Sequence, residues 1–144
     1  MVASTFAFFN CFMEDVAEKV HNLGSDTLKV LLTNTAPVAT NTVKTNITEI
    51  TAGNGYTEGG ETLTVSSSSQ SSGTYKLVIA DKTITASGGS IGSFRYAVIY
   101  NDTSTSDSLI GWVDYGSSIT LNDTEPFTLD FDGTNGLFTL AVAP

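Results

Sequence analysis

The sequence predicts a mainly β protein, a single-domain antiparallel β-sandwich or jelly roll with one N-terminal amphipathic helix. Short runs of β-branched and aromatic residues recur about every ten residues, and clusters of Gly, Asn, Asp and Ser separate them. Helical periodicity is confined to residues 1–23. The length of 144 residues is that of one domain. We therefore expect residues 1–24 to form a helix that packs on or anchors a β-sandwich of residues 25–144.

The centre of the expected sheet is a long antiparallel hairpin. Its two limbs, residues 94–100 and 108–115, are rich in aromatic and β-branched residues. The intervening residues 101–107 consist mainly of Asn, Asp, Ser and Thr, which favour turns. Alternation along the first limb predicts that four of its side chains share one face of the sheet. These four residues are Phe94, Tyr96, Val98 and Tyr100.

Other strands are expected on both sides of this hairpin, at residues 27–33, 61–65, 74–80, 82–86, 127–131 and 137–142. The turn residues 132–136 predict that the last two of these strands form a hairpin with each other. The low-complexity segment 66–72 is expected to be a flexible loop. The Thr-rich segment 40–51 is expected to be an edge strand or an extended arm.

The N-terminal helix carries its apolar residues at steps of three and four, and Gly24 is its expected end. Two interpretations remain open, since this stripe could dock on the protein's own sheet or fit another subunit. Glu14 and Asp15 interrupt the apolar run, so neither a secretion signal nor a membrane span is expected. The aromatic residues that would contact another subunit are Phe6, Phe8, Phe9 and Phe12.

The charge of the chain argues against several classes of partner. Fifteen acidic residues against six basic ones give a formal net charge of −9. Nucleic-acid affinity depends on Lys and Arg contacts to phosphate, so we expect no nucleic-acid partner. A polybasic patch for membrane binding is missing for the same reason. One Cys and one His cannot make an internal disulfide or a four-ligand zinc site, and no cofactor is expected.

No motif for catalysis is evident, and the protein is not expected to be an enzyme. The Asp-rich turns near Asp107 and Asp132 could attract a cation, but turn chemistry is the favoured interpretation. Arg95 is the only arginine and is expected to make a specific ion pair, either buried or at an interface. Several residues have the types found in sugar-binding sites, although a row of aromatic residues in a central strand more often forms core. These residues are Tyr96, Tyr100, Asn101, Trp112, Asp114 and Tyr115.

Several segments resemble small virion proteins of tailed bacteriophages, over about residues 8–140. The matching segments are residues 8–9, 26–37, 50–56, 73–77, 94–102 and 110–116. The resemblance implies a structural protein that decorates or cements the outside of the capsid. Its partners would be the major capsid protein and itself, as a homotrimer, on virions assembled in the host cytoplasm.

Contacts with the shell or with another subunit could come from the Phe-rich N-terminus, from Arg95, or from the Thr-rich segment. Within that segment the apolar candidates are Val43, Ile47 and Ile50. An extended arm of this kind could add a strand to a neighbour's sheet. The alternatives are a tail or fibre component and a carbohydrate-binding module for attachment to the host.

Overall fold

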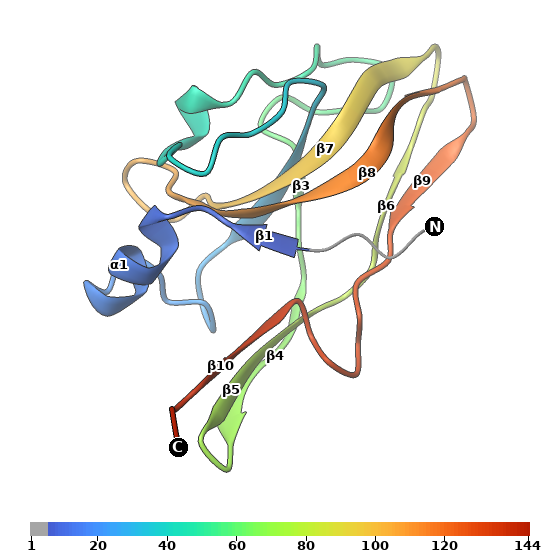
Figure 1. The fold of residues 1–144 in the computed structure, drawn as a ribbon. Helices are drawn as coiled ribbons and strands as arrows, with labels where there is room; N and C mark the ends of the chain where they lie inside the picture. Colours follow the sequence, from blue (N-terminus) through green and yellow to red (C-terminus); the bar gives the residue numbers. More distant parts are fainter. Residues whose placement is uncertain (1–5) are drawn as a thin grey trace.

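The computed structural model describes residues 6–144 and shows a mainly β protein with one short α-helix near its N-terminus (Figure 1). This confirms the coarse expectation of a mainly β protein with one helix, and the strands pair antiparallel throughout. The elements in chain order are β1 (Phe6–Phe8), α1 (Cys11–Ala17), β2 (Leu28–Thr33), the 3₁₀ turn η1 (Lys44–Asn46), β3 (Glu61–Thr62), β4 (Val65–Ser71), β5 (Thr74–Ile79), β6 (Lys82–Thr85), β7 (Ile91–Asn101), β8 (Leu109–Leu121), β9 (Pro126–Leu129) and β10 (Phe138–Ala141).

The strands form one large sheet and two small ones. The large sheet has the order β1-β8-β7-β2-β3, so the β7–β8 hairpin lies at its centre, as predicted from the sequence. The small sheets have the orders β10-β5-β4 and β6-β9. In Figure 1, β4, β5 and β10 extend below the large sheet, whereas β6 and β9 lie beside β8.

Two apolar clusters form the core. The larger cluster draws side chains from the large sheet, from both small sheets and from α1. The smaller cluster lies among Phe9, Leu31, Val98, Tyr100 and Leu109, and is covered by parts of the N-terminal segment and of segment 34–60. Long stretches of the central strands are therefore buried on both faces, which explains why they contain few charged residues.

The predicted sharing of one face by four side chains of β7 is wrong. The pairing of β7 with β8 shifts register between Phe94 and Tyr96. Phe94 consequently packs in the larger cluster, whereas Val98 and Tyr100 pack in the smaller one. A β-bulge adds residues to one strand and so changes the face on which the following side chains point. Strict alternation in the sequence cannot reveal it.

The N-terminal helix is shorter than the predicted one, which was expected to run to Gly24. Residues 1–5 lie outside the described part of the chain, and residues 6–8 pair with β8 as an edge strand. The helix ends at Ala17, and Lys19 follows in the left-handed region with φ of 67°. The N–H groups of Lys19 and Val20 donate to the carbonyls of Val16 and Asp15. This is the Schellman arrangement, with lysine at the position that glycine usually takes.

Two predictions about connections are also wrong. Residues 65–71, expected largely as a flexible loop, form strand β4, which pairs with β5 along most of its length. Ser72 and Gly73 both have positive φ, as a two-residue hairpin turn requires. The last two strands do not form a hairpin with each other, because β9 pairs with β6 and β10 pairs with β5.

The Thr-rich segment is neither an edge strand nor an extended arm. It forms the turn η1 and makes an isolated β-bridge between Val43 and Ser108. Further along, Glu49 accepts hydrogen bonds from the Tyr56 hydroxyl at 2.7 Å and from the Gly59 N–H at 2.8 Å. The Ile50 N–H also donates to the Leu32 carbonyl of β2 at 3.0 Å, so the end of the segment is held against its own sheet.

Candidate functional site

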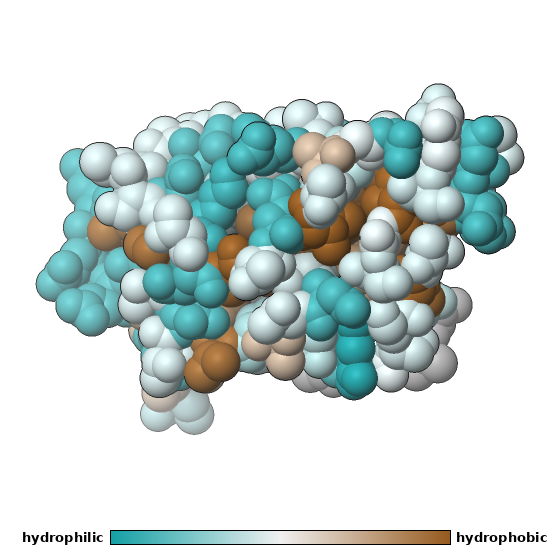
Figure 2. All heavy atoms as spheres, turned by 90° about the horizontal axis from the view of Figure 1, so that it is seen from above, coloured by the Kyte–Doolittle hydropathy of each residue, from teal (hydrophilic) through white to brown (hydrophobic). Residues whose placement is uncertain are grey.

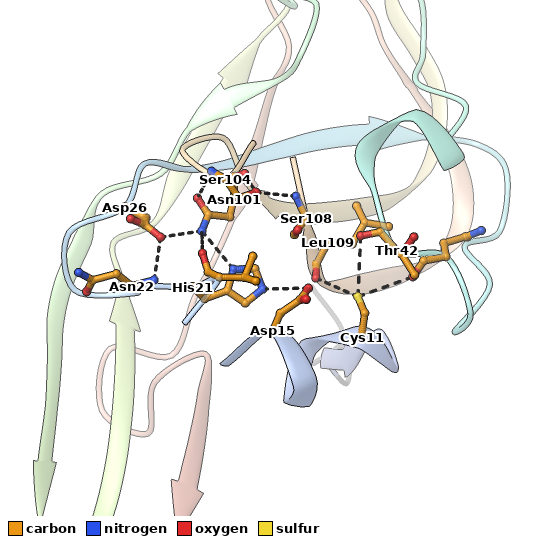
Figure 3. Close-up of polar contacts among 12 residues, drawn as sticks. Cys11, Asp15, His21, Asn22, Asp26, Thr42, Asn101, Ser104, Ser108 and Leu109 are labelled. Atoms are coloured by element: carbon orange, nitrogen blue, oxygen red, sulfur yellow. Dashed lines mark hydrogen bonds and ion pairs between the residues drawn. The ribbon is translucent and has the colours of Figure 1, made fainter. Parts of the chain in front are cut away.

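A polar network joins the N-terminal segment to the tip of the β7–β8 hairpin (Figure 3). At its centre is Asn101, the last residue of β7, which is fully buried. Its Nδ2 donates to Asp26 Oδ2 at 2.7 Å and to His21 Nδ1 at 3.1 Å. Its Oδ1 accepts from the N–H groups of Thr103 at 2.9 Å and Ser104 at 3.2 Å. These contacts fix the orientation of the amide, because both of its ends are engaged.

His21 is held neutral by its surroundings. Its side chain is fully buried, and its Nδ1 accepts from Asn101, which places the ring proton on Nε2. Nε2 lies 3.7 Å from Asp15 Oδ2 and has no hydrogen-bond partner among the described residues. Burial lowers the pKa of His21, although the negative charges of Asp15 and Asp26 partly oppose this effect. The imidazole therefore serves as a fixed acceptor in the network.

Cys11 lies at the start of α1 and faces backbone carbonyls. Its Sγ is 3.6 Å from the Leu109 oxygen, 3.8 Å from that of Thr42 and 3.9 Å from that of Asn41. Burial, with a contribution from Asp15, raises the pKa of the thiol to about 11. A reactive cysteine needs a lowered pKa, so this thiol is a hydrogen-bond donor rather than a nucleophile at neutral pH.

The network can position chain segments, and its chemistry is that of a structural clamp. It connects α1, the 21–26 loop and the 101–108 turn, which are far apart in sequence. Within residues 6–144, no three His, Cys, Asp or Glu side chains are grouped so that they could hold a metal ion. The same residues contain no helix of the length and apolarity needed to cross a bilayer.

The four aromatic residues predicted for an interface lie mainly inside the protein. Phe9 is 1% exposed and Phe12 is fully buried, so both belong to the protein's own core. Phe6 and Phe8 are half-buried on the edge strand β1, where their rings pack against Phe138 at 6.1 and 5.0 Å between centroids. The helix thus docks on its own domain, and the expectation that Phe9 and Phe12 meet another subunit is corrected.

The interface candidates in the Thr-rich segment also pack against the protein's own domain. Val43, Ile47 and Ile50 are all half-buried. Ile47 packs against the smaller cluster and Ile50 against the larger one. Each of the three side chains is still partly exposed, so a partner could contact it. None of them lies on an arm that extends away from the domain.

Arg95 makes a specific ion pair, as predicted, but the pair is neither buried nor at an interface within the described chain. Its Nε donates to Asp114 Oδ1 at 2.8 Å and its Nη2 to Asp114 Oδ2 at 3.0 Å. The paired side chains are 38% and 41% exposed, so this bidentate pair lies at the surface. The hydrogen bond from Arg95 holds the pKa of Asp114 below its usual value.

The residues considered for sugar binding do not form one exposed platform. Tyr100 is fully buried, and its hydroxyl donates to the Gly59 carbonyl at 2.6 Å. Trp112 is half-buried and packs on Phe9 at 4.6 Å between ring centroids. Asn101 is at the centre of the buried network, and Asp114 is engaged by Arg95.

An apolar cleft, which the sequence did not reveal, lies between the large sheet and β9. Its volume is about 290 Å³. The buried rings of Phe94 and Phe127 meet edge to face at 5.1 Å, and Tyr115 packs on Phe127 at 5.7 Å. The remaining lining comes from neighbouring strands and from the β9–β10 connection, and includes Phe6, Arg95, Tyr96, Ala97, Val113, Leu129, Asp130, Phe131, Asp132, Gly136 and Leu137. No local pattern could have predicted it, because its residues come from distant parts of the sequence.

The fold and these sites define an antiparallel β-rich protein in which a polar clamp fixes the N-terminal helix to the central hairpin. Comparisons with protein-family models, curated proteins and solved structures found no match for this chain. Its function is therefore proposed from its own residues and from the resemblance of its segments described under Sequence analysis.

Proposed function

We propose that this protein is a structural protein of a tailed bacteriophage, which decorates the outside of the capsid and bridges its subunits. The observation that carries the structural role is the use of Cys11, His21 and Asn101 to hold the fold together. The resemblance of the strand and turn segments to small virion proteins supplies the viral context. A net charge of −9 suits a position outside the shell, because DNA would repel it.

A rigid body would serve this role, and we propose that the sheets form a jelly-roll-like sandwich around the larger cluster. Support comes from the composition of that cluster, which includes Val30 and Ile99 of the large sheet, Leu77 of β5 and Ile84 of β6. Facing sheets that share one core resist shear, because sliding would expose apolar area from both sides.

The protein would act as a homotrimer placed at local three-fold positions of the shell. Closed symmetry matches such positions, and many weak contacts on a lattice add up to stable attachment. The half-buried residues Phe6 and Phe8 on edge strand β1, together with Val43, Ile47 and Ile50, are the proposed contacts. The major capsid protein would be the partner.

Binding to purified shells tests this function. The protein is added to expanded, DNA-free shells of the phage that encodes it, and to unexpanded shells as a control. We expect saturable co-sedimentation with the expanded shells and a higher melting temperature of those shells. Light scattering of the free protein should give three times the chain mass of 15.1 kDa. Absence of binding together with recovery of the protein in tails would contradict the proposal, as would a saturable change in tryptophan fluorescence on glycans without shell binding.

A further inference from the structure

We propose that the cleft between the large sheet and β9 binds an extended segment of another protein, in which a bulky apolar side chain is flanked by Lys or Arg. The cleft holds about 290 Å³, which is enough for one or two apolar side chains but not for a folded domain. Its floor is built from Phe94, Phe127 and Phe131, all less than 10% exposed. An aliphatic or aromatic side chain would gain most from burial against these rings.

The charged side chains at the rim of the cleft determine which charge a bound segment should carry. Arg95 at the rim is neutralised by the bidentate contact with Asp114. Asp130 and Asp132 also line the cleft and take part in none of the ion pairs found among the described residues. Lys76 lies near Asp132 and keeps its positive charge while its ammonium donates to the Thr134 carbonyl at 2.8 Å, so it offsets only one of these two carboxylates. The rim is thus acidic, and a cationic segment complements it.

The neighbouring strand edge favours a polypeptide over a small molecule. Strand β8 runs to Leu121, but β1 pairs with it only at residues 111–113. Beyond Val113, this edge of β8 has no strand partner among the described residues, and Tyr115 on the same stretch lines the cleft. An extended segment could therefore bond to this part of the β8 edge, which pairs with no other described strand, while its side chain enters the cleft.

The walls of the cleft are already formed. Asp132 accepts from the N–H groups of Thr134 at 2.8 Å and Asn135 at 2.7 Å, which fixes the β9–β10 connection. The Phe131 N–H donates to Asp81 Oδ1 at 2.9 Å. On the face drawn in Figure 2, hydrophobic residues occur as patches set between hydrophilic ones rather than as one broad surface. Binding at a preformed cleft loses little conformational entropy, so a short segment can suffice.

Three capped pentapeptides test this inference with the isotope-labelled full chain. The sequences are Lys-Lys-Leu-Phe-Lys, its acidic counterpart Glu-Glu-Leu-Phe-Glu, and Lys-Lys-Ser-Ser-Lys, which lacks the apolar anchor. We expect only the first to bind with a dissociation constant below about 1 mM, and to shift the amide signals of residues 113–115 and 127–132. Equal binding of the acidic peptide or of the serine peptide would overturn the proposal.

Two charge reversals provide the matched comparison. Asp130→Lys changes an exposed rim residue, and Glu58→Lys makes the same change of net charge at an exposed residue that does not line the cleft. The first should weaken binding of the basic peptide by at least about fivefold, and the second by less than about twofold. Equal weakening by both would show general attraction to an acidic chain and overturn the inference.

Two further outcomes would assign the cleft to a different occupant. Concentration-dependent shifts of the same signals without peptide would identify a second copy of this chain. Shifts of these signals after removal of residues 1–5, which precede Phe6, would identify the protein's own N-terminal segment. The inferred segment need not belong to a capsid protein. The peptide experiment therefore tests the cleft independently of the shell-binding experiment.

Discussion

At the scale of single residues, the side chains that could take part in chemistry instead stabilise the fold. Cys11 meets three carbonyl oxygens, and Asn101 uses both ends of its amide. The sequence presents both as ordinary polar residues, one near a helix and one before a turn. Two Nδ2 partners of Asn101 lie 75 and 80 residues away, and the partners of Cys11 lie 30 to 98 residues away, whereas the Oδ1 partners of Asn101 are its near neighbours in the sequence. Spacing along the chain cannot reveal such contacts.

The reactivity of Cys11 should be low in the folded protein. Its pKa of about 11 leaves about 0.1% thiolate at pH 8, against about 10% for the unfolded chain. We expect labelling by iodoacetamide at pH 8 to be roughly a hundredfold slower in the native state than in denaturant. Mass spectrometry of quenched samples measures both rates. Similar rates would mean that the thiol is not held against the carbonyls.

Lys19 should be a site of local strain. A side chain with a Cβ atom is disfavoured at φ of 67°, whereas glycine accepts this conformation. Lys19→Gly should therefore raise the free energy of unfolding by about 0.5–1 kcal/mol, measured by urea denaturation. Lys19→Ala keeps the Cβ atom and removes the charge, so it should change stability by only a few tenths of a kcal/mol. A gain from alanine equal to that from glycine would point to charge instead of backbone conformation.

At the scale of elements, the sequence predicts the apolar strands well and the polar ones poorly. The pattern of β7 and β8 identifies a central hairpin because both strands are apolar and aromatic. Strand β4 was missed because serine has little preference for strands, and its stability comes from pairing with β5 and from the contact of Ser68 with Tyr75 at 2.8 Å. Whether such a polar segment forms a strand depends on its tertiary contacts, which the local sequence does not show.

The candidate interface was predicted only in part for a related reason. An apolar stripe on a helix looks the same whether it meets its own sheet or another subunit. The burial of Phe12 in the core shows that the apolar stripe of the helix packs on its own domain. For Arg95 the ion pair was predicted correctly, because Asp114 lies beside it across the hairpin, but its expected buried or interfacial position was not, since the pair is exposed.

The docking of α1 should depend on pH through His21. Its pKa is lowered in the folded state, so the unfolded chain binds more protons as the pH falls through about 6.5. The stability contributed by neutral His21 is fully present above that pH and is lost below it. Protonation of Nδ1 would also bring two hydrogen-bond donors, the ring N–H and the Asn101 amide N–H, face to face. Asp15 and Asp26 face the ring and reduce the size of the effect without reversing it.

The chain has a single histidine, so this dependence can be isolated. Free energies of unfolding are measured between pH 7.5 and 5.5, a range above the usual carboxylate pKa values. The native protein should lose stability across this range, and His21→Leu should flatten the profile. An unchanged slope in the variant would mean that His21 is not the group responsible.

At the scale of the whole molecule, the described residues form a mainly β body with an edge strand, β1, and an apolar cleft. Parts of the N-terminal segment and of segment 34–60 pack against the smaller cluster, whereas side chains of both small sheets pack in the larger one. The proposed role outside a capsid would use the net charge of −9, which repels DNA.

A density map of the virion by electron cryomicroscopy tests this role most directly. Particles that contain the protein are compared with particles from which its gene has been deleted. The proposed function predicts that the deletion removes discrete trimeric densities from the outer surface of the head, at local three-fold positions. Loss of density from the tail, from inside the shell next to the DNA, or from neither would contradict it.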